Sequence, residues 1–234
     1  GAENWPRFRG ENGDGQSDLK GLPTAFSPGE LEWNIDLPGF GHGSPVVWDD
    51  RLFVTSALGE DDQLRGGVLR YLFCLDADTG RERWSRMIGS SQSHRHQKNS
   101  WASSTPATDG ELVYVAFADL DNHLLSAYDF DGNLIWRRNL GPFESQHGQG
   151  VSPIVHKDLV ILPNDQDGPS SIAAFDRRTG RTVWSTLRSI ERASYATPLI
   201  IEHEGGPPQH ICASGATGLS SLDPETGRVN WSTG

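Results

Sequence analysis

Five residues with side chains suited to ligand binding lie at matching places in four short loops: His42, Trp101, Ser103, Gln149 and Tyr195. Each loop ends in a Ser-Pro or Thr-Pro pair. Alignment on the proline places His42, Ser103 and Tyr195 three residues before it, with Trp101 and Gln149 one or two places earlier. If the loops converge, they form a site for a polar ligand with some stacking surface. The small residues of the same loops equally suit close packing between neighbouring elements.

Three short segments contain residue types that bind metal ions, but none carries a complete pattern. His94 and His96 lie two apart and share one face if their segment is a strand. A third ligand must then come from elsewhere, and the basic residues around them disfavour a cation. Residues 11–15 and 164–168 lack the alternating acids or closing Glu of a calcium loop. We therefore predict turns and solvated loops, and no metal site.

Catalytic motifs are missing from the sequence. No nucleophile elbow, Gly-rich phosphate loop or paired-carboxylate motif is present. The two cysteines, Cys74 and Cys212, stand alone in apolar stretches, so we expect buried free thiols. This favours a non-catalytic protein over an enzyme, although residues distant in an all-β chain can still converge.

The charge and hydropathy of the chain disfavour several classes of binding partner. A net charge of -11 disfavours binding to nucleic acid and to anionic membrane surfaces. No window approaches the roughly 18 apolar residues of a membrane span. The chain begins Gly1-Ala2-Glu3, which is no natural start, so we expect that an export signal has been removed.

A repeat organises most of the sequence. Residues 76–84, 176–184 and 223–231 all fit Asp-x-x-Thr-Gly-Arg-x-x-Trp, and residues 129–136 carry a version one residue shorter. Trp33 has the flanks of the same strand without the turn before it. Successive Trp residues, from Trp33 to Trp231, are 51, 52, 48 and 47 residues apart. Such a period predicts one supersecondary unit per repeat.

The Ser/Thr-Pro pairs repeat in phase with the Trp motif. Each opens a unit, and the unit continues through further apolar runs separated by turn residues, which predicts four antiparallel strands. The Asp and Gly of the motif suit a tight turn, and its Trp is expected to fill the gap between neighbouring units. Four strands in about 45–50 residues is the size of a β-propeller blade.

The predicted fold is therefore all-β, a β-propeller of four-stranded antiparallel blades. Four blades are expected at about 37–87, 101–139, 148–187 and 193–234. Residues 31–36 are expected to form an N-terminal orphan strand that belongs to another blade, and residues 1–30 an irregular segment.

The two repeated motifs resemble the pyrroloquinoline-quinone-like propeller repeat, over about residues 31–234. That resemblance covers quinone-dependent dehydrogenases and a larger set of propellers without cofactor, which includes a lipoprotein scaffold of outer-membrane barrel assembly. Residues 5–15, 41–45, 98–106 and 164–168 look closest to exported, non-catalytic bacterial members. The dehydrogenases of the family use adjacent cysteines over the quinone and a calcium ion held by Glu, Asn and Asp. This chain has no adjacent cysteines.

The resemblance implies a non-catalytic binding or scaffold module of the bacterial cell envelope, periplasmic or otherwise exported. Its expected partner is a protein or polysaccharide, and no cofactor is expected. The alternative is a dehydrogenase that uses pyrroloquinoline quinone with calcium, or a fragment of one. Because the family usually builds seven or eight blades, three arrangements stay open. They are a truncated propeller, a homodimer of half-propellers that closes a ring, and a four-bladed closure.

Overall fold

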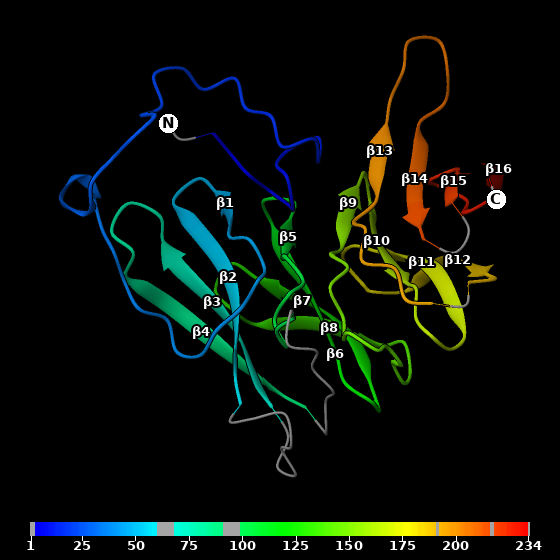
Figure 1. Ribbon diagram of the computed structural model, residues 1–234, viewed down its shortest axis with the longest axis horizontal. Coiled ribbons are helices and arrows are strands. Elements are labelled where there is room, and N and C mark those ends of the chain that lie inside the picture. The colour runs from blue at the N-terminus through cyan, green and yellow to red at the C-terminus, as the bar shows by residue number, and fades with distance from the viewer. Residues whose placement is uncertain (1–2, 60–67, 91–98, 191, 216–217, 234) are drawn as a thin grey trace.

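Four antiparallel sheets form the body of the protein. The computed structural model describes residues 3–59, 68–90, 99–190, 192–215 and 218–233. Each sheet has four strands that neighbour one another in chain order, and the sheets follow one another from cyan to red in Figure 1. The prediction of an all-β fold with four four-stranded blades is confirmed.

The strand bounds show how closely the blades repeat one another. Blade 1 contains β1 (Val46–Trp48), β2 (Arg51–Leu58), β3 (Leu69–Asp76) and β4 (Glu82–Gly89). Blade 2 contains β5 (Ala107–Thr108), β6 (Leu112–Ala118), β7 (His123–Asp129) and β8 (Leu134–Asn139). Blade 3 contains β9 (Ile154–His156), β10 (Leu159–Asn164), β11 (Ser170–Asp176) and β12 (Thr182–Arg188). Blade 4 contains β13 (Leu199–Ile201), β14 (Gln209–Ser214), β15 (Gly218–Leu222) and β16 (Val229–Ser232). A single 3-10 turn, η1 (Pro28–Glu30), precedes them in the described chain.

The hydrophobic core lies between neighbouring blades. Three clusters of buried side chains join blade 1 to blade 2, blade 2 to blade 3, and blade 3 to blade 4. The strand β6 is buried along its whole length, which explains why it reads as a nearly continuous apolar run. A strand covered on both faces has no solvent side on which polar residues would alternate.

The Trp residues of the repeat seal these blade interfaces. Trp84, Trp136 and Trp184 each donate the indole N–H to a carbonyl in the Asp/Gly turn of the next blade. The acceptors are Phe130 O at 2.8 Å, Arg177 O at 2.9 Å and Pro224 O at 3.0 Å. The turn glycines beneath the rings have positive φ and leave no room for a Cβ. The motif thus couples each blade to the next.

The first and last Trp of the series differ in their surroundings. Trp33 donates to Ala77 O at 3.0 Å and packs over Gly80, as the other Trp residues do on their turns. Residues 31–36, predicted as an orphan strand, belong to none of the strands in the described chain, because no neighbouring strand pairs with them. Trp231 is 42 % exposed and its indole donates instead to Gln209 Oε1 of its own blade.

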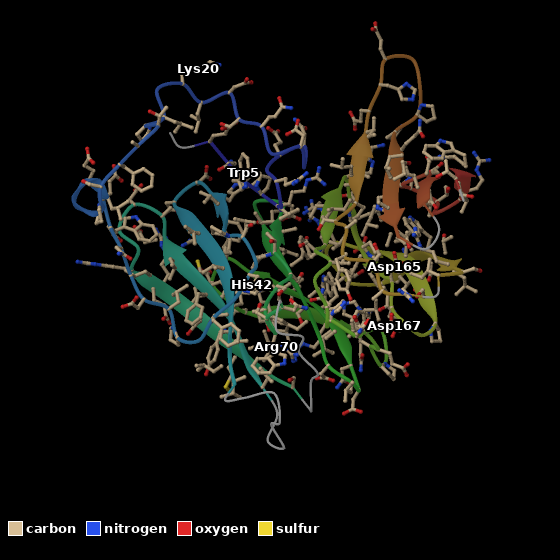
Figure 2. All side chains as sticks on the ribbon, viewed as in Figure 1. Trp5, Lys20, His42, Arg70, Asp165 and Asp167 are labelled. Atoms are coloured by element: carbon tan, nitrogen blue, oxygen red, sulfur yellow. The ribbon has the colours of Figure 1, made fainter. Side chains whose placement is uncertain are left out.

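The N-terminal segment crosses the inner strands at one end of the sheets. Trp5 forms a two-bond antiparallel bridge with Val47 of β1, and Pro6 O accepts from Thr108 N of β5 at 2.8 Å. We call this the turn end, because the tight turns that follow β1, β5 and β9 lie there. The opposite loop end carries the loops 37–45, 99–106, 140–153 and 192–198, which lead into the inner strands. Figure 2 shows Trp5 on the opposite side of the sheets from Arg70 and Asp167.

Candidate functional site

Two hydroxyl groups link the first three of the four loops at the loop end. Ser44 N donates to Thr105 Oγ1 at 2.9 Å, and Thr105 N donates to Ser152 Oγ at 2.9 Å. Each contact joins the residue before the proline in one blade to its equivalent in the next. The Ser/Thr-Pro pairs were predicted only as strand starts, and their role in joining the loops was missed. The recurring hydroxyl before each proline was the available signal.

His42 lies at the tip of the first loop with its side chain exposed (Figure 2). Its backbone N–H donates to Ala102 O and Ser100 Oγ, both at 3.1 Å. The next residue, Gly43, also donates to Ala102 O, and a Cβ there would lie 2.7 Å from Ser104 O. The backbone of the first loop is therefore fixed against the second, and the imidazole of His42 faces solvent.

Trp101 and Gln149 turn into the protein. Trp101 is 7 % exposed, belongs to the core between blades 1 and 2, and packs 5.9 Å from the ring of Phe40. The Gln149 side chain is buried and its Nε2 donates to Val151 O at 2.6 Å. Both residues stay at the loop end, but the structure gives their side chains packing and bridging contacts within the protein.

Asn99 joins the second loop to the third. Its Nδ2 donates to His147 O at 2.5 Å, and its Oδ1 accepts from the half-buried Ser103 hydroxyl. The Ser103 hydroxyl also lies 2.9 Å from Ser100 Oγ. Ser103 thus holds Asn99 in place. No sequence motif marked Asn99 as a link between loops, because its acceptor His147 O lies in the next loop, 48 residues along the chain.

Tyr195 is exposed, with a relative exposure of 41 %. Its hydroxyl lies 2.9 Å from Ser145 Oγ, and its ring lies 6.0 Å from the ring of His147. Pockets that bind small ligands typically have volumes of about 300–1,000 Å³. The open cavity beside Tyr195 has a volume of about 640 Å³ and is lined by Gln146, His147, Asp167, Arg192, Ala193 and Tyr195.

Asp167 fixes two of the loops that surround this cavity. Its Oδ1 accepts from Ala193 N and its Oδ2 accepts from Gln146 N, both at 2.8 Å. One carboxylate therefore ties the third loop to the fourth. Residues 164–168 were predicted only as a turn, and the role of Asp167 was missed because it depends on contacts with the loops that lead into blades 3 and 4.

Buried polar pairs lie beneath the loops. Arg70 of blade 1 donates to Trp101 O at 3.0 Å and Ala118 O at 2.6 Å, and burial lowers its pKa to about 10. His123 Nδ1 lies 2.7 Å from Asn164 Oδ1, and burial lowers the pKa of His123 to about 4. These contacts tie blade 1 to blade 2 and blade 2 to blade 3, so the loops stand on a fixed base.

Asp165 and Arg188 form a less complete buried pair. Asp165 Oδ1 and Arg188 Nε lie 3.1 Å apart, but their geometry does not make a hydrogen bond. Neither atom has another hydrogen-bond partner among the described residues. Burial raises the pKa of Asp165 to about 6, and the charge of Arg188 opposes that rise. Because the pairing is poor, desolvation dominates the pKa of this carboxyl.

The described residues do not fit a quinone with calcium. Cys74 and Cys212 are buried free thiols in β3 and β14, as predicted, and burial raises the pKa of both. Trp101, the predicted loop residue with the largest aromatic side chain, is packed in the core. Among the described residues, no three His, Cys, Asp or Glu side chains gather to hold a metal ion. His94 and His96 lie outside the described residues.

The sequence of the chain matches the model of one protein family. The family model described as outer membrane protein assembly factor BamB matches residues 19–95 and 70–234. No curated protein sequence gives a match. In the described part of the chain, no helix is long and apolar enough to cross a membrane.

Solved structures share the fold at low sequence identity. BamB from Moraxella catarrhalis is 18 % identical with a TM-score of 0.52, and the match covers 86 % of this chain and 51 % of that chain. A quinohemoprotein alcohol dehydrogenase from Comamonas testosteroni is 14 % identical with a TM-score of 0.61, over 98 % of this chain and 49 % of that one. A europium-containing methanol dehydrogenase is 14 % identical with a TM-score of 0.54, over 83 % and 42 %. The chain thus spans about half the length of these structures or less.

Proposed function

Because the chain belongs to the family described as outer membrane protein assembly factor BamB, we propose that it is a non-catalytic propeller module that binds a protein at its loop end. The family resemblance predicted from the repeats is confirmed by this match. The name of the family refers to protein assembly, and a scaffold role for this chain follows that lead. Among the described residues, no group of side chains matches the quinone and calcium site that the dehydrogenase alternative requires.

The observation that carries the proposal is the interlocked arrangement of the loops. Hydrogen bonds join each loop to the next, through Ser44 and Thr105, through Asn99, and through Asp167. Their exposed tips present His42 and Tyr195 on a base that is already ordered. A preorganised surface loses little conformational entropy on binding. Tyr and Arg side chains are also enriched where proteins meet.

The family of the chain suggests where the protein acts in the cell, and its charge suggests what kind of partner surface it binds. We propose a location in the bacterial cell envelope, where an assembly factor of this kind would work. The net charge of -11 favours a neutral or basic partner surface, because opposite charges steer association. A polysaccharide is the other ligand class that this open, polar face would accept.

Site-specific photo-crosslinking in envelope extract tests the proposal. A photoreactive residue at Tyr195 should give discrete crosslinked protein bands. The same residue at Leu134, which is exposed on the outer strand β8 of blade 2, should give none. Equal crosslinking from both positions, or none from Tyr195, would contradict a protein site at the loop end. Binding of polysaccharide fragments without protein crosslinks would indicate that the partner is a polysaccharide and not a protein.

A second variant tests whether the ordered loops matter. Asp167→Ala removes the carboxylate that holds the third and fourth loops together, so crosslinking from Tyr195 should fall several-fold. Asp78→Ala is the matched control, because Asp78 is an exposed carboxylate in a turn at the other end of blade 1. Unchanged crosslinking in the Asp167 variant would argue against preorganisation as the basis of binding.

A further inference from the structure

Blade 4 is joined to blade 3 less closely than blades 1, 2 and 3 are joined to one another. At the loop end, the hydroxyl groups of Thr105 and Ser152 link the first loop to the second and the second to the third. Thr197 holds the equivalent place before the proline of the fourth loop, but in the described chain no hydrogen bond joins it to Ser152. The series of hydroxyl contacts therefore stops at blade 3.

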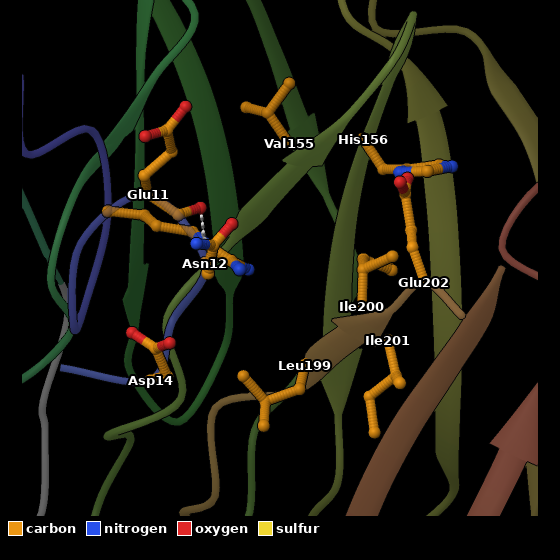
Figure 3. Close-up of a pocket in the computed structure, with 10 residues that line it drawn as sticks. Glu11, Asn12, Asp14, Val155, His156, Leu199, Ile200, Ile201 and Glu202 are labelled. Atoms are coloured by element: carbon orange, nitrogen blue, oxygen red, sulfur yellow. Dashed lines mark hydrogen bonds between the residues drawn. The ribbon is translucent and has the colours of Figure 1, made fainter. Parts of the chain in front are cut away.

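A cavity of about 490 Å³ lies between the inner strands of blades 3 and 4 at the turn end. Figure 3 shows Val155 and His156 of β9 on one side of it, and Leu199 and Ile200 of β13 on the other. The inner strands β1, β5 and β9, by contrast, lie in contact with one another in turn. The inner side of the interface between blades 3 and 4 thus lacks packing that would resist separation.

The buried seal of this interface also differs in kind. Four residues after the Trp of the repeat, blade 1 has Ile88 and blade 2 has Leu140, and both pack against the apolar core shared with the next blade. Blade 3 has Arg188 at this place. Its side chain is buried 3.1 Å from the buried Asp165 carboxylate without making a hydrogen bond. A buried ion pair with such geometry contributes little net stability, because desolvation of both charges offsets their attraction.

The blade 4 side of the interface supplies no further charge to this pair. The charge of Arg188 acts on His210 and Cys212 of β14. Burial lowers the pKa of His210 to about 3 and raises the pKa of Cys212 to about 12, so both side chains are neutral near pH 7. Water that enters when the blades separate hydrates both Arg188 and Asp165, which lowers the cost of opening.

The contacts that remain lie at the outer edge of the interface. Trp184 and Thr186 donate to carbonyl groups in the turn 223–227 of blade 4. Glu225 of this turn also pairs with Lys157, and both of these side chains are exposed. We propose that blade 4 opens from blade 3 by rotation about these outer contacts, while blades 1, 2 and 3 stay packed.

This opening changes the shape of the cavity beside Tyr195. His147 comes from the third loop and Tyr195 from the fourth, so the two walls move apart when blade 4 rotates. Asp167 ties these loops together two residues after Asp165 and therefore restrains the same motion. The consequence for binding rests on the proposed function, whereas the opening itself does not.

The two cysteines report on the opening directly. Cys212 is buried between blades 3 and 4, and Cys74 is buried between blades 1 and 2. N-ethylmaleimide reaches either thiol only when the surrounding blades separate. Mass spectrometry of peptides from the native, labelled protein measures both rates in one sample. We expect Cys212 to react at least about tenfold faster than Cys74, as residues of the least stable unit do. Equal rates, or faster labelling of Cys74, would overturn the proposal.

A double variant separates the role of the ion pair from general fraying of blade 4. Asp165→Ala with Arg188→Leu gives blade 3 the residues of blade 2, where Ala118 and Leu140 hold these places. Because both charges are removed together, labelling of Cys212 should slow several-fold. An unchanged rate at Cys212 would show that the ion pair does not govern the opening, and would overturn the proposal. Labelling of Cys74 checks that the variant stays folded, and its rate should match that of wild type.

The link between the opening and the cavity has its own test. Asp167→Ala removes the tie between the third and fourth loops, so Cys212 should label several-fold faster, whereas the exposed control Asp78→Ala should leave the rate unchanged. Equal rates in these two variants would contradict the link. None of these measurements involves a partner, so their outcome is independent of crosslinking from Tyr195.

Discussion

Replacement of Trp184 by Ala tests how the blades are held together. Trp184 is 8 % exposed and lies between blades 3 and 4. Its indole donates to Pro224 O at 3.0 Å, and its ring covers Gly227 of the next turn. The substitution removes the ring from the blade interface, leaves a cavity there, and leaves the carbonyl of Pro224 without its donor.

The expected cost follows from the buried area and the lost hydrogen bond. A buried Trp removes about 150–250 Å² from water, worth about 4–6 kcal/mol at about 25 cal/mol per Å² as an upper estimate. Truncation of a buried Trp to Ala typically lowers the free energy of unfolding by about 3–5 kcal/mol. This total already includes the indole hydrogen bond, which contributes about 1 kcal/mol. We therefore expect the free energy of unfolding to fall by about 3–5 kcal/mol.

Urea unfolding followed by circular dichroism measures this loss, and the chain supplies its own control. Trp231 occupies the same place in the repeat but is 42 % exposed, and its indole donates to Gln209 of its own blade instead of to a turn of another blade. Trp231→Ala should cost less than about 1 kcal/mol, as substitutions at exposed positions usually do. If the Trp184 and Trp231 variants lose equal stability, the indole does not act as a seal between blades.

Two further predictions concern the turns and the buried imidazole. Gly180→Ala should lower the free energy of unfolding by about 2–3 kcal/mol, because φ is +67° and a Cβ would lie 2.6 Å from the Trp136 ring. Gly15 has a similar φ of +78° but open space around it, so Gly15→Ala should cost only about 1 kcal/mol in the same urea assay. Equal losses would show that the ring does not press on the turn. Burial lowers the pKa of His123 from 6.5 to about 4, so the unfolded chain binds this proton first and wild-type stability should fall as pH drops from about 6.5 to 4. The loss should reach about 3 kcal/mol relative to His123→Gln, which keeps a polar partner for Asn164 but does not titrate. Parallel pH profiles of wild type and variant would contradict a buried neutral His123.

The blades could be predicted from the sequence because their signals are local and repeat. The turn chemistry lies within a few residues, as in Asp176, whose Oδ1 accepts from the N–H of Thr179 at 2.8 Å. The period of the Trp motif then placed each unit in phase. Residues 31–36 differ because a strand also needs a partner, and the flanks of Trp33 say nothing about whether one is present.

The site was predicted less completely, for physical reasons that particular residues show. The five candidate residues do lie in loops at one end, because alignment on the prolines fixes where each loop sits. Side-chain direction in an irregular loop has no period, so nothing in the sequence showed that Trp101 and Gln149 turn inward. Asn99 and Asp167 each join two different loops, and such contacts exist only once the blades have packed.

Hydrogen–deuterium exchange of the chain with its crosslinked protein partner tests most directly where partners bind. Binding at the loop end predicts slower exchange confined to residues 37–45, 99–106, 140–153 and 192–198, with the outer strands β4, β8 and β12 unchanged. Slower exchange along those outer strands with unchanged loops would contradict the proposed function.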